Sequence, residues 1–176
     1  MKTNWAGVER GLAQYKWIMD TLRKVDVSTD REFQKRFNGF YRIRQRTPEF
    51  YDAFYKKMEA SKEGICPTFA EVLDYFWQRL HRIEASFSSK LVATINPDLP
   101  VWDKEVLKNL KLKKPIPTDK NRLNKTKKLY DSIKDWYANH LTTEESKAQL
   151  SEFDNRFPNS GISDTKKIDL VLWQTR

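Results

Sequence analysis

The sequence predicts an all-helical protein, with about nine helices packed into one compact body of one or two lobes. The chain has only five glycines in 176 residues, and its apolar residues recur at spacings of three and four over most of the length. Its 10 Phe, 7 Tyr and 6 Trp are enough for a buried core at this size. No strand-like alternation and no repeat at a fixed period accompany them. We therefore expect one helical domain over residues 1–176, with a loop or lobe boundary at 111–119.

The first two helices are expected over residues 4–24 and then from an N-cap at Ser28 or Asp30. The second has aromatic residues on one side and the most basic face of the chain on the other. Such a face suits a polyanion, and it is also typical of a solvated surface. The residues of this face that we select as nucleic-acid contacts are Arg42, Arg44 and Arg46.

The next two helices have clear starts. Pro48 after Thr47 suits the first helical position, and Thr68 with Glu71 forms a capping box that opens a central helix. The helix that begins at Pro48 carries an aromatic stripe interleaved with charges. Such a stripe could stack on nucleic-acid bases, but its helical spacing favours a core face, which is our interpretation. The stripe consists of Phe50, Tyr51, Phe54, Tyr55 and Met58.

The last three helices follow a proline-containing linker at residues 111–120. Thr118 or Asp119 is the expected cap of the first, and Thr142 with Glu145 forms a capping box for the second. The final helix follows Ser163 or Asp164, and its apolar end should pack against the body. The first of these three helices carries a second basic cluster, from which we select Lys125, Lys127 and Lys128 as nucleic-acid contacts.

The charge balance favours a polyanionic partner. Lys and Arg number 33 against 24 Asp and Glu, which gives a pI near 9.5. DNA is therefore the expected partner, with a merely solvated basic surface as the alternative; the sequence identifies no protein partner. The single cysteine, Cys66, excludes an internal disulfide and a cysteine-based zinc site. With no signal peptide or membrane span in the sequence, we expect a cytoplasmic protein without a membrane partner, metal or cofactor.

Residues 83–110 contain the candidate chemistry. Two helical patterns, beginning near Ser88 and Asp103, are separated by a turn rich in proline and polar residues, so Lys90 and Asp103 could lie close together. A lysine beside a carboxylate can act as an amine nucleophile with an electrostatic partner. In the alternative interpretation, Lys90 is an exposed helix charge and Asp103 is an N-cap worth about 1 kcal/mol.

The order of these parts resembles the helix-hairpin-helix superfamily of DNA glycosylases. In that family a helix, a hairpin of pattern G-x-G-x-K, a second helix and an aspartate-led third helix follow one another. Lys90 falls at the position of the nucleophilic lysine of bifunctional members, and Asp103, within P-V-W-D-x-x-V, at that of the catalytic aspartate. Ser86 and Ser88 stand where the family has hairpin glycines, and the interval from Lys90 to Asp103 is shorter than is usual there.

The resemblance implies base excision without a cofactor. A flipped nucleotide would enter a pocket, Lys90 would attack the sugar carbon, and Asp103 would stabilise the developing positive charge. Ser86, Ser88 and Ser89 would then lie against a DNA phosphate. The alternative function is a non-catalytic helical interaction or regulatory protein without a nucleic-acid partner. The two functions differ in whether Lys90 and Asp103 face a common cleft.

Overall fold

The computed structural model describes residues 3–175, apart from the side chain of Glu105. This part of the chain forms nine α-helices and, besides them, a single isolated antiparallel bridge between Thr3 and Thr175. The all-helical expectation is therefore confirmed for the described residues. The helices are α1 (Trp5–Leu22), α2 (Arg31–Tyr41), α3 (Pro48–Ser61), α4 (Phe69–Leu80), α5 (Ala85–Ile95), α6 (Lys104–Asn109), α7 (Arg122–His140), α8 (Glu144–Arg156) and α9 (Asp164–Gln174).

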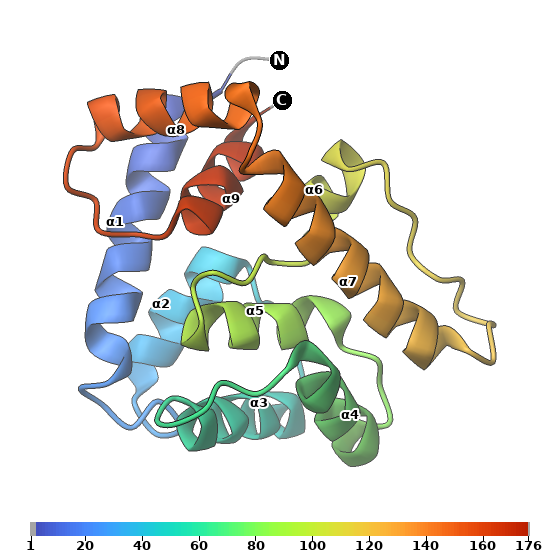
Figure 1. Cartoon of the computed structure of the whole chain (residues 1–176). Helices are drawn as coiled ribbons and strands as arrows, with labels where there is room; N and C mark the ends of the chain where they lie inside the picture. Colours follow the sequence, from blue (N-terminus) through green and yellow to red (C-terminus); the bar gives the residue numbers. More distant parts are fainter. Residues whose placement is uncertain (1–2, 176) are drawn as a thin grey trace.

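The helices form two groups joined by α1 and α7 (Figure 1). Helices α2 to α5 lie together at one end of the molecule, and α8 and α9 lie at the other. Helix α1 runs along one side and packs against both α2 and α9, while α7 runs along the opposite side and contacts α4. The segment between α6 and α7, where the sequence predicted a loop, has no helix.

Most helix starts agree with the sequence. The carboxylate of Asp30 accepts a hydrogen bond from the amide of Phe33 (2.7 Å), Thr47 caps α3, and Thr68 and Glu71 form the expected capping box. Capping side chains satisfy amide groups that a helix start leaves without partners.

Two caps differ from the prediction. Thr143, not Thr142, caps α8: the hydroxyl of Thr143 accepts from the amide of Ser146 (3.1 Å), whereas the hydroxyl of Thr142 donates to the carbonyl of Asn139 (2.7 Å). Helix α7 begins at Arg122 without a side-chain cap, since the carboxylate of Asp119 stabilises the preceding turn by accepting from the amide of Asn121 (2.8 Å).

The basic segment after α2 is not helical, which corrects the sequence prediction. Helix α2 ends at Tyr41, because Arg42 adopts a left-handed conformation (φ 54°). The amide of Ile43 then returns to the carbonyl of Asn38 (2.9 Å), a common way to end a helix, and the Ile43 side chain is buried. Arg42, Arg44 and Arg46 therefore lie in the loop between α2 and α3.

The connection between α4 and α5 lies a few residues earlier than predicted, because α4 was expected to reach Ile83 and the next helix to begin near Ser88. His81 is left-handed (φ 53°), and residues 81–84 form the whole turn before α5 begins at Ala85. Ser86 and Ser88, where the resemblance placed a hairpin, are thus in the first turns of α5. Helix α6 follows directly after Asp103, as expected.

The aromatic stripe on α3 forms part of the core, which confirms our interpretation of it. Phe50, Phe54, Tyr55 and Met58 are almost completely buried and pack with residues of α2, α4 and α5. The apolar end of α9 is also docked, because Leu170 and Val171 belong to a second buried cluster shared with α1 and α8.

Two glycines on α1 allow α9 to approach closely. A Cβ atom at Gly7 would overlap the side chain of Gln174, and one at Gly11 would lie 3.3 Å from Leu170. The amide of Asn4 donates to the carbonyl of Gln174 (3.0 Å) beside this contact. Glycine costs helix stability in general, and here the contact between α1 and α9 explains its presence.

Candidate active site

A pocket of about 420 Å³ lies where α1, α2, α5 and α9 meet the residue that precedes α6. Both Lys90 and Asp103 line it, so the structure places the two sequence-predicted residues in a common cleft. The pocket is lined by Asn4, Gly7, Arg10, Gly11, Gln14, Gly39, Phe40, Tyr41, Arg42, Lys90, Asp103, Leu170, Trp173 and Gln174.

Lys90 is a buried lysine on α5, with only 6% of its surface exposed. Its Nζ donates to the backbone carbonyl of Tyr41 (3.3 Å) and lies 5.1 Å from the ring centroid of Phe87. Burial lowers the pKa of Lys90 to about 8; Asp103 acts in the opposite direction, and Lys114 lowers it further. Lys90 is therefore not the exposed helix charge of the alternative interpretation.

Asp103 is partly buried and directly precedes α6. Its carbonyl accepts from the amide of Leu107 (3.0 Å), which is the first hydrogen bond of that helix. It interacts electrostatically with Lys90. Asp103 thus combines a position at the start of a helix with an electrostatic influence on Lys90.

A single serine fixes the relative position of the two candidate residues. The hydroxyl of Ser89 accepts from the amide of Trp102 (2.8 Å) and donates to the carbonyl of Ser86 (2.8 Å). Ser89 is adjacent to Lys90, and Trp102 is adjacent to Asp103. Both Ser89 and Trp102 are buried, so this contact is shielded from water and holds the two segments in register.

Aromatic side chains form one wall of the pocket. The ring centroid of Phe40 lies 4.6 Å from that of Tyr41 and 5.5 Å from that of Trp173. The hydroxyl of Tyr41 and the indole nitrogen of Trp173 are buried without a hydrogen-bond partner among the described residues. Such groups are rare in folded proteins, and here they leave unused donors in two side chains of the pocket wall.

Of the three serines predicted to contact nucleic acid, two are buried inside the protein. The side chains of Ser88 and Ser89 are fully buried, and the hydroxyl of Ser88 has no hydrogen-bond partner in the described part of the chain. Ser86 is partly exposed. A nucleic-acid contact from this turn, which stays a prediction, would have to come from Ser86 or from the backbone.

The three predicted arginines have different surroundings. Arg42 is exposed and lines the pocket, and Arg44 is exposed outside it. Arg46 forms an ion pair with the buried Glu84, and its guanidinium lies 4.4 Å from the ring centroid of Phe50. Arg46 therefore stabilises the junction between α3 and the α4–α5 turn.

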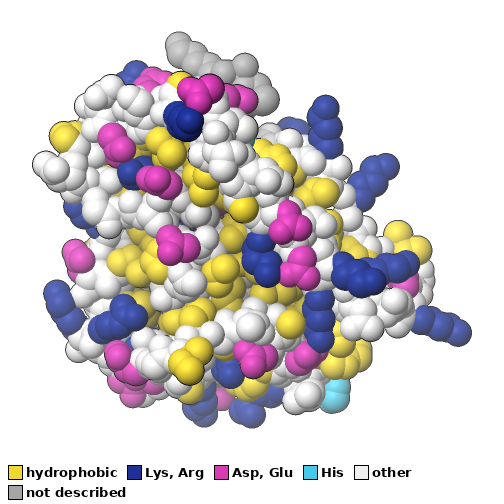
Figure 2. Space-filling model, viewed as in Figure 1, with side chains coloured by type: hydrophobic (Ala, Val, Ile, Leu, Met, Phe, Trp, Pro, Cys, Tyr) yellow, Lys and Arg dark blue, Asp and Glu magenta, His cyan; other side chains and the backbone are white. Residues whose placement is uncertain are grey.

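The second basic cluster lies apart from this pocket. Lys125 and Lys127 on α7 form ion pairs with Asp119 and Asp74, and Lys128 is exposed. Basic side chains project from the side of the molecule where α7 begins (Figure 2). None of these three lysines lines the pocket that holds Lys90.

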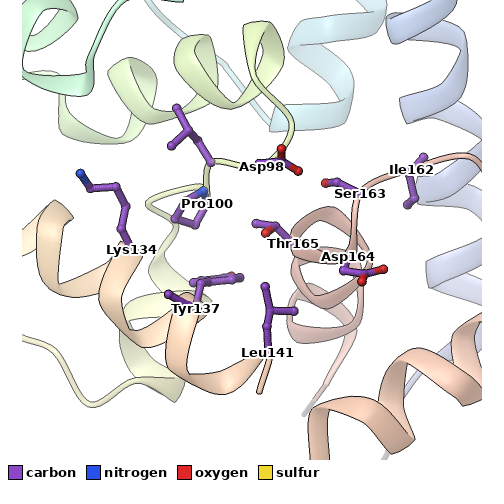
Figure 3. A pocket seen from close by; sticks show the side chains of 11 residues that line it. Asp98, Pro100, Lys134, Tyr137, Leu141, Ile162, Ser163, Asp164 and Thr165 are labelled. Carbon is purple, nitrogen blue, oxygen red and sulfur yellow. The ribbon is translucent and has the colours of Figure 1, made fainter. Parts of the chain in front are cut away.

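A larger pocket, of about 640 Å³, lies between α7 and the start of α9. Figure 3 shows Tyr137 from α7 facing Ser163 and Thr165 across it. Three of its polar side chains are already engaged, because Tyr137 donates to Asp169, Ser163 caps α9, and Lys134 pairs with Asp131 (2.8 Å). Size alone does not make it the better candidate, because its lysine, Lys134, is partly exposed and paired with Asp131, whereas Lys90 is buried.

Sequence reasoning missed three features of the site. The structural role of Ser89, the close packing at Gly7 and the presence of Arg10 at the pocket all depend on contacts between distant segments. The spacing of Gly7, Gly11 and Gln14 along one face of α1 was the only local signal.

No cluster of three or more His, Cys, Asp or Glu side chains that could hold a metal ion occurs among the described residues. Within the same part of the chain, no helix is long and apolar enough to cross a membrane. Comparison with protein-family models, with curated proteins and with solved structures finds no match.

Proposed function

We propose that the chain is a nucleic-acid enzyme of the base-excision type, in which Lys90 is the nucleophile and Asp103 stabilises positive charge. The observation that carries this proposal is the buried amine of Lys90, with its pKa lowered to about 8, in a pocket that Asp103 also lines. Lysines that act as amine nucleophiles typically have a pKa that burial has lowered.

The lowered pKa matters because only the neutral amine attacks. A lysine with the ordinary pKa of 10.5 is neutral in about 0.03% of molecules at pH 7, whereas a pKa of about 8 raises this to about 10%. The gain in reactive amine is roughly 300-fold.

In the proposed reaction, Lys90 Nζ attacks the sugar carbon that bears the base. The carbon–nitrogen bond to the base breaks, its electron pair leaves with the base, and the base takes up a proton. The attacking nitrogen loses a proton, the sugar ring opens, and a Schiff base forms between Lys90 and the sugar. The carboxylate of Asp103 stabilises the positive charge that develops on the sugar.

The pocket suits a single extrahelical nucleotide. Its volume falls within the ~300–1,000 Å³ usual for small-ligand sites. Phe40 and Trp173 supply apolar ring surface against which a base could stack.

Borohydride trapping tests the proposal. Wild-type protein should form a covalent cross-link with duplexes that contain an abasic site or a damaged base, because borohydride reduces a Schiff base to a stable amine. Lys90→Ala and Lys90→Arg should not, since neither side chain supplies a neutral primary amine. Lys104→Ala, which removes an exposed lysine next to Asp103, is the matched control and should cross-link normally. If the wild-type protein forms no cross-link with duplexes that carry any of the common lesions, the proposal is contradicted.

A second candidate function is a helical interaction protein without catalytic activity. It is favoured by the internal ion pairs of Arg46, Lys125 and Lys127, which occupy basic groups expected to meet a polyanion. A DNA-binding titration over a salt series separates the two functions. Binding that weakens steeply with salt supports a nucleic-acid partner, and absence of binding at low salt supports the interaction protein.

A further inference from the structure

We propose that Arg10 and Arg42 form a phosphate-binding mouth to the Lys90 pocket, which holds the phosphate of a nucleotide while its base and sugar lie inside. This inference rests on the proposed function, in which the pocket receives a nucleotide. It assigns the recognition of the phosphate to one residue of α1, Arg10, and to Arg42, which directly follows α2.

The two arginines share three properties. Both line the pocket, both are exposed, and neither forms an ion pair with any described side chain. Arg46, by contrast, is neutralised by Glu84. Arg10 and Arg42 therefore keep their hydrogen-bonding groups available for a ligand.

The charge of the pocket is unbalanced. Its charged lining residues are three cations, Arg10, Arg42 and Lys90, and one carboxylate, Asp103. Since Lys90 is buried and the arginines are exposed, the two arginines form the outer part of the positive region. A phosphate bound there would stay in contact with water, which avoids the high cost of burying a dianion or monoanion.

The backbone around the mouth leaves room for a ligand. Gly39, near the end of α2, also lines the pocket, and a Cβ atom placed on it would meet nothing within 4 Å. Arg42 follows one turn later, where the helix has ended. Gly7, Gly11 and Gln14 of α1, together with its N-cap Asn4, extend the same wall on either side of Arg10.

Arginine suits phosphate because its planar guanidinium offers parallel N–H donors to two oxygens at once. The phosphate could be an internal phosphodiester of a strand or the terminal group of a free nucleotide. The shared chemistry is a phosphate next to a nucleoside, and the experiment below separates the two sources.

The test measures binding of a fluorescent duplex with a tetrahydrofuran abasic analogue between about 50 and 200 mM salt. Replacing one phosphate contact should lower the magnitude of the slope of log K against log salt by about 1. Arg10→Gln/Arg42→Gln should therefore lower it by about 2 and weaken binding at least tenfold. The control Lys16→Gln/Lys24→Gln removes two exposed lysines that do not line the pocket, and it should leave the slope nearly unchanged.

Competition then identifies the source of the phosphate. If a nucleoside 5′-monophosphate displaces the duplex from the wild type better than the nucleoside does, and this advantage is lost in the arginine double variant, the mouth accepts a terminal phosphate. If neither the nucleoside nor its 5′-monophosphate competes, but the arginine double variant still has a smaller salt slope, the mouth holds a phosphodiester within a strand. Both outcomes support the inference.

An arginine double variant with the slope and affinity of the lysine control would overturn it. That result is distinguishable from failure of the proposed function, which is read from trapping at Lys90. If the wild type is trapped normally and the arginine double variant has an unchanged salt slope, only the phosphate-binding mouth is disproved. If the arginine double variant has a smaller salt slope but the wild type is not trapped, only the catalytic proposal is disproved.

Discussion

Lys166 and Asp169 form an ion pair of 3.3 Å inside α9 in which both side chains are completely buried. The hydroxyl of Tyr137 donates to the other carboxylate oxygen of Asp169, and Lys166 Nζ lies 5.0 Å from the ring centroid of Trp173. Burial raises the pKa of Asp169, although Lys166 and Tyr137 act in the opposite direction. Because Trp173 also lines the Lys90 pocket, this pair supports a wall of the candidate site.

Removing one partner of this pair should be strongly destabilising. We expect Lys166→Met to lower the free energy of unfolding by about 3–5 kcal/mol, because the Asp169 carboxylate loses its buried counter-charge. Lys166→Met/Asp169→Leu should recover part of the loss, although the hydroxyl of Tyr137 then lacks its acceptor. Urea unfolding of the three proteins measures this, and a single variant as stable as the wild type would refute it.

Two neighbouring serines should respond in opposite ways to alanine. Ser89→Ala leaves the buried amide of Trp102 without an acceptor, so we expect a loss of about 1–3 kcal/mol. Ser88→Ala removes a buried hydroxyl that has no partner among the described residues, and it should be neutral or stabilising. Thermal unfolding compares the two. Equal effects would show that the hydrogen bond between Ser89 and Trp102 does not stabilise the register of the site.

The buried amine of Lys90 should make stability depend on pH. The folded state releases the Lys90 proton near pH 8 and the unfolded state near pH 10.5, so between these values the unfolded state binds more protons. The contribution of Lys90 to stability therefore rises with pH through this window, by about 3 kcal/mol at most. Subtracting the pH profile of Lys90→Met from that of the wild type isolates this contribution. A difference that stays constant from pH 8 to 10 would contradict the prediction.

Replacing Asp103 should shift the titration of Lys90. The carboxylate raises the pKa of Lys90, so Asp103→Asn should lower that pKa further. The pH at which borohydride trapping reaches half its maximum should move down, while the maximal rate should fall because the charge on the sugar is less stabilised. A lower maximum with an unmoved midpoint would mean that Asp103 does not interact with Lys90 in solution.

Gly39 offers a way to obstruct the pocket without disturbing the core. Gly39→Ala should stabilise the protein by roughly 0.5–1 kcal/mol, since glycine is a poor helix former and the added methyl group meets nothing within 4 Å. Gly39→Leu should fold equally well but narrow the pocket, and both trapping and duplex binding should weaken. Unaltered binding by the leucine variant would place the ligand elsewhere.

The fold was largely predictable because its signals are local. The carboxylate of Asp30, the Thr68–Glu71 capping box and Pro48 act within one helical turn, and each begins a helix where the sequence indicates. The aromatic stripe of α3 was also recognisable as core, since its spacing matches one helix face.

The site was predictable only in part. Lys90 and Asp103 could be chosen from their residue types and the intervening turn, but their shared pocket also needs α1 and α9. The end of α2 was misjudged because a left-handed Arg42 has no sequence signal comparable to a glycine. Ser89 was predicted to contact nucleic acid at the surface. Its hydroxyl instead accepts a hydrogen bond from the amide of Trp102, which lies beyond the next turn and gives no local signal in the sequence.

The contact between α1 and α9 has a consequence for the order of folding. The amide of Asn4 and the carbonyl of Gln174 join segments that are synthesised at very different times, and both residues line the Lys90 pocket. Helices α2 to α5 can pack while the ribosome is still adding later residues, but the pocket is incomplete until α9 docks against Gly7 and Gly11. Until α9 has docked, the pocket lacks the wall that Leu170, Trp173 and Gln174 provide, so we expect Lys90 to be more accessible to water at that stage than in the folded chain.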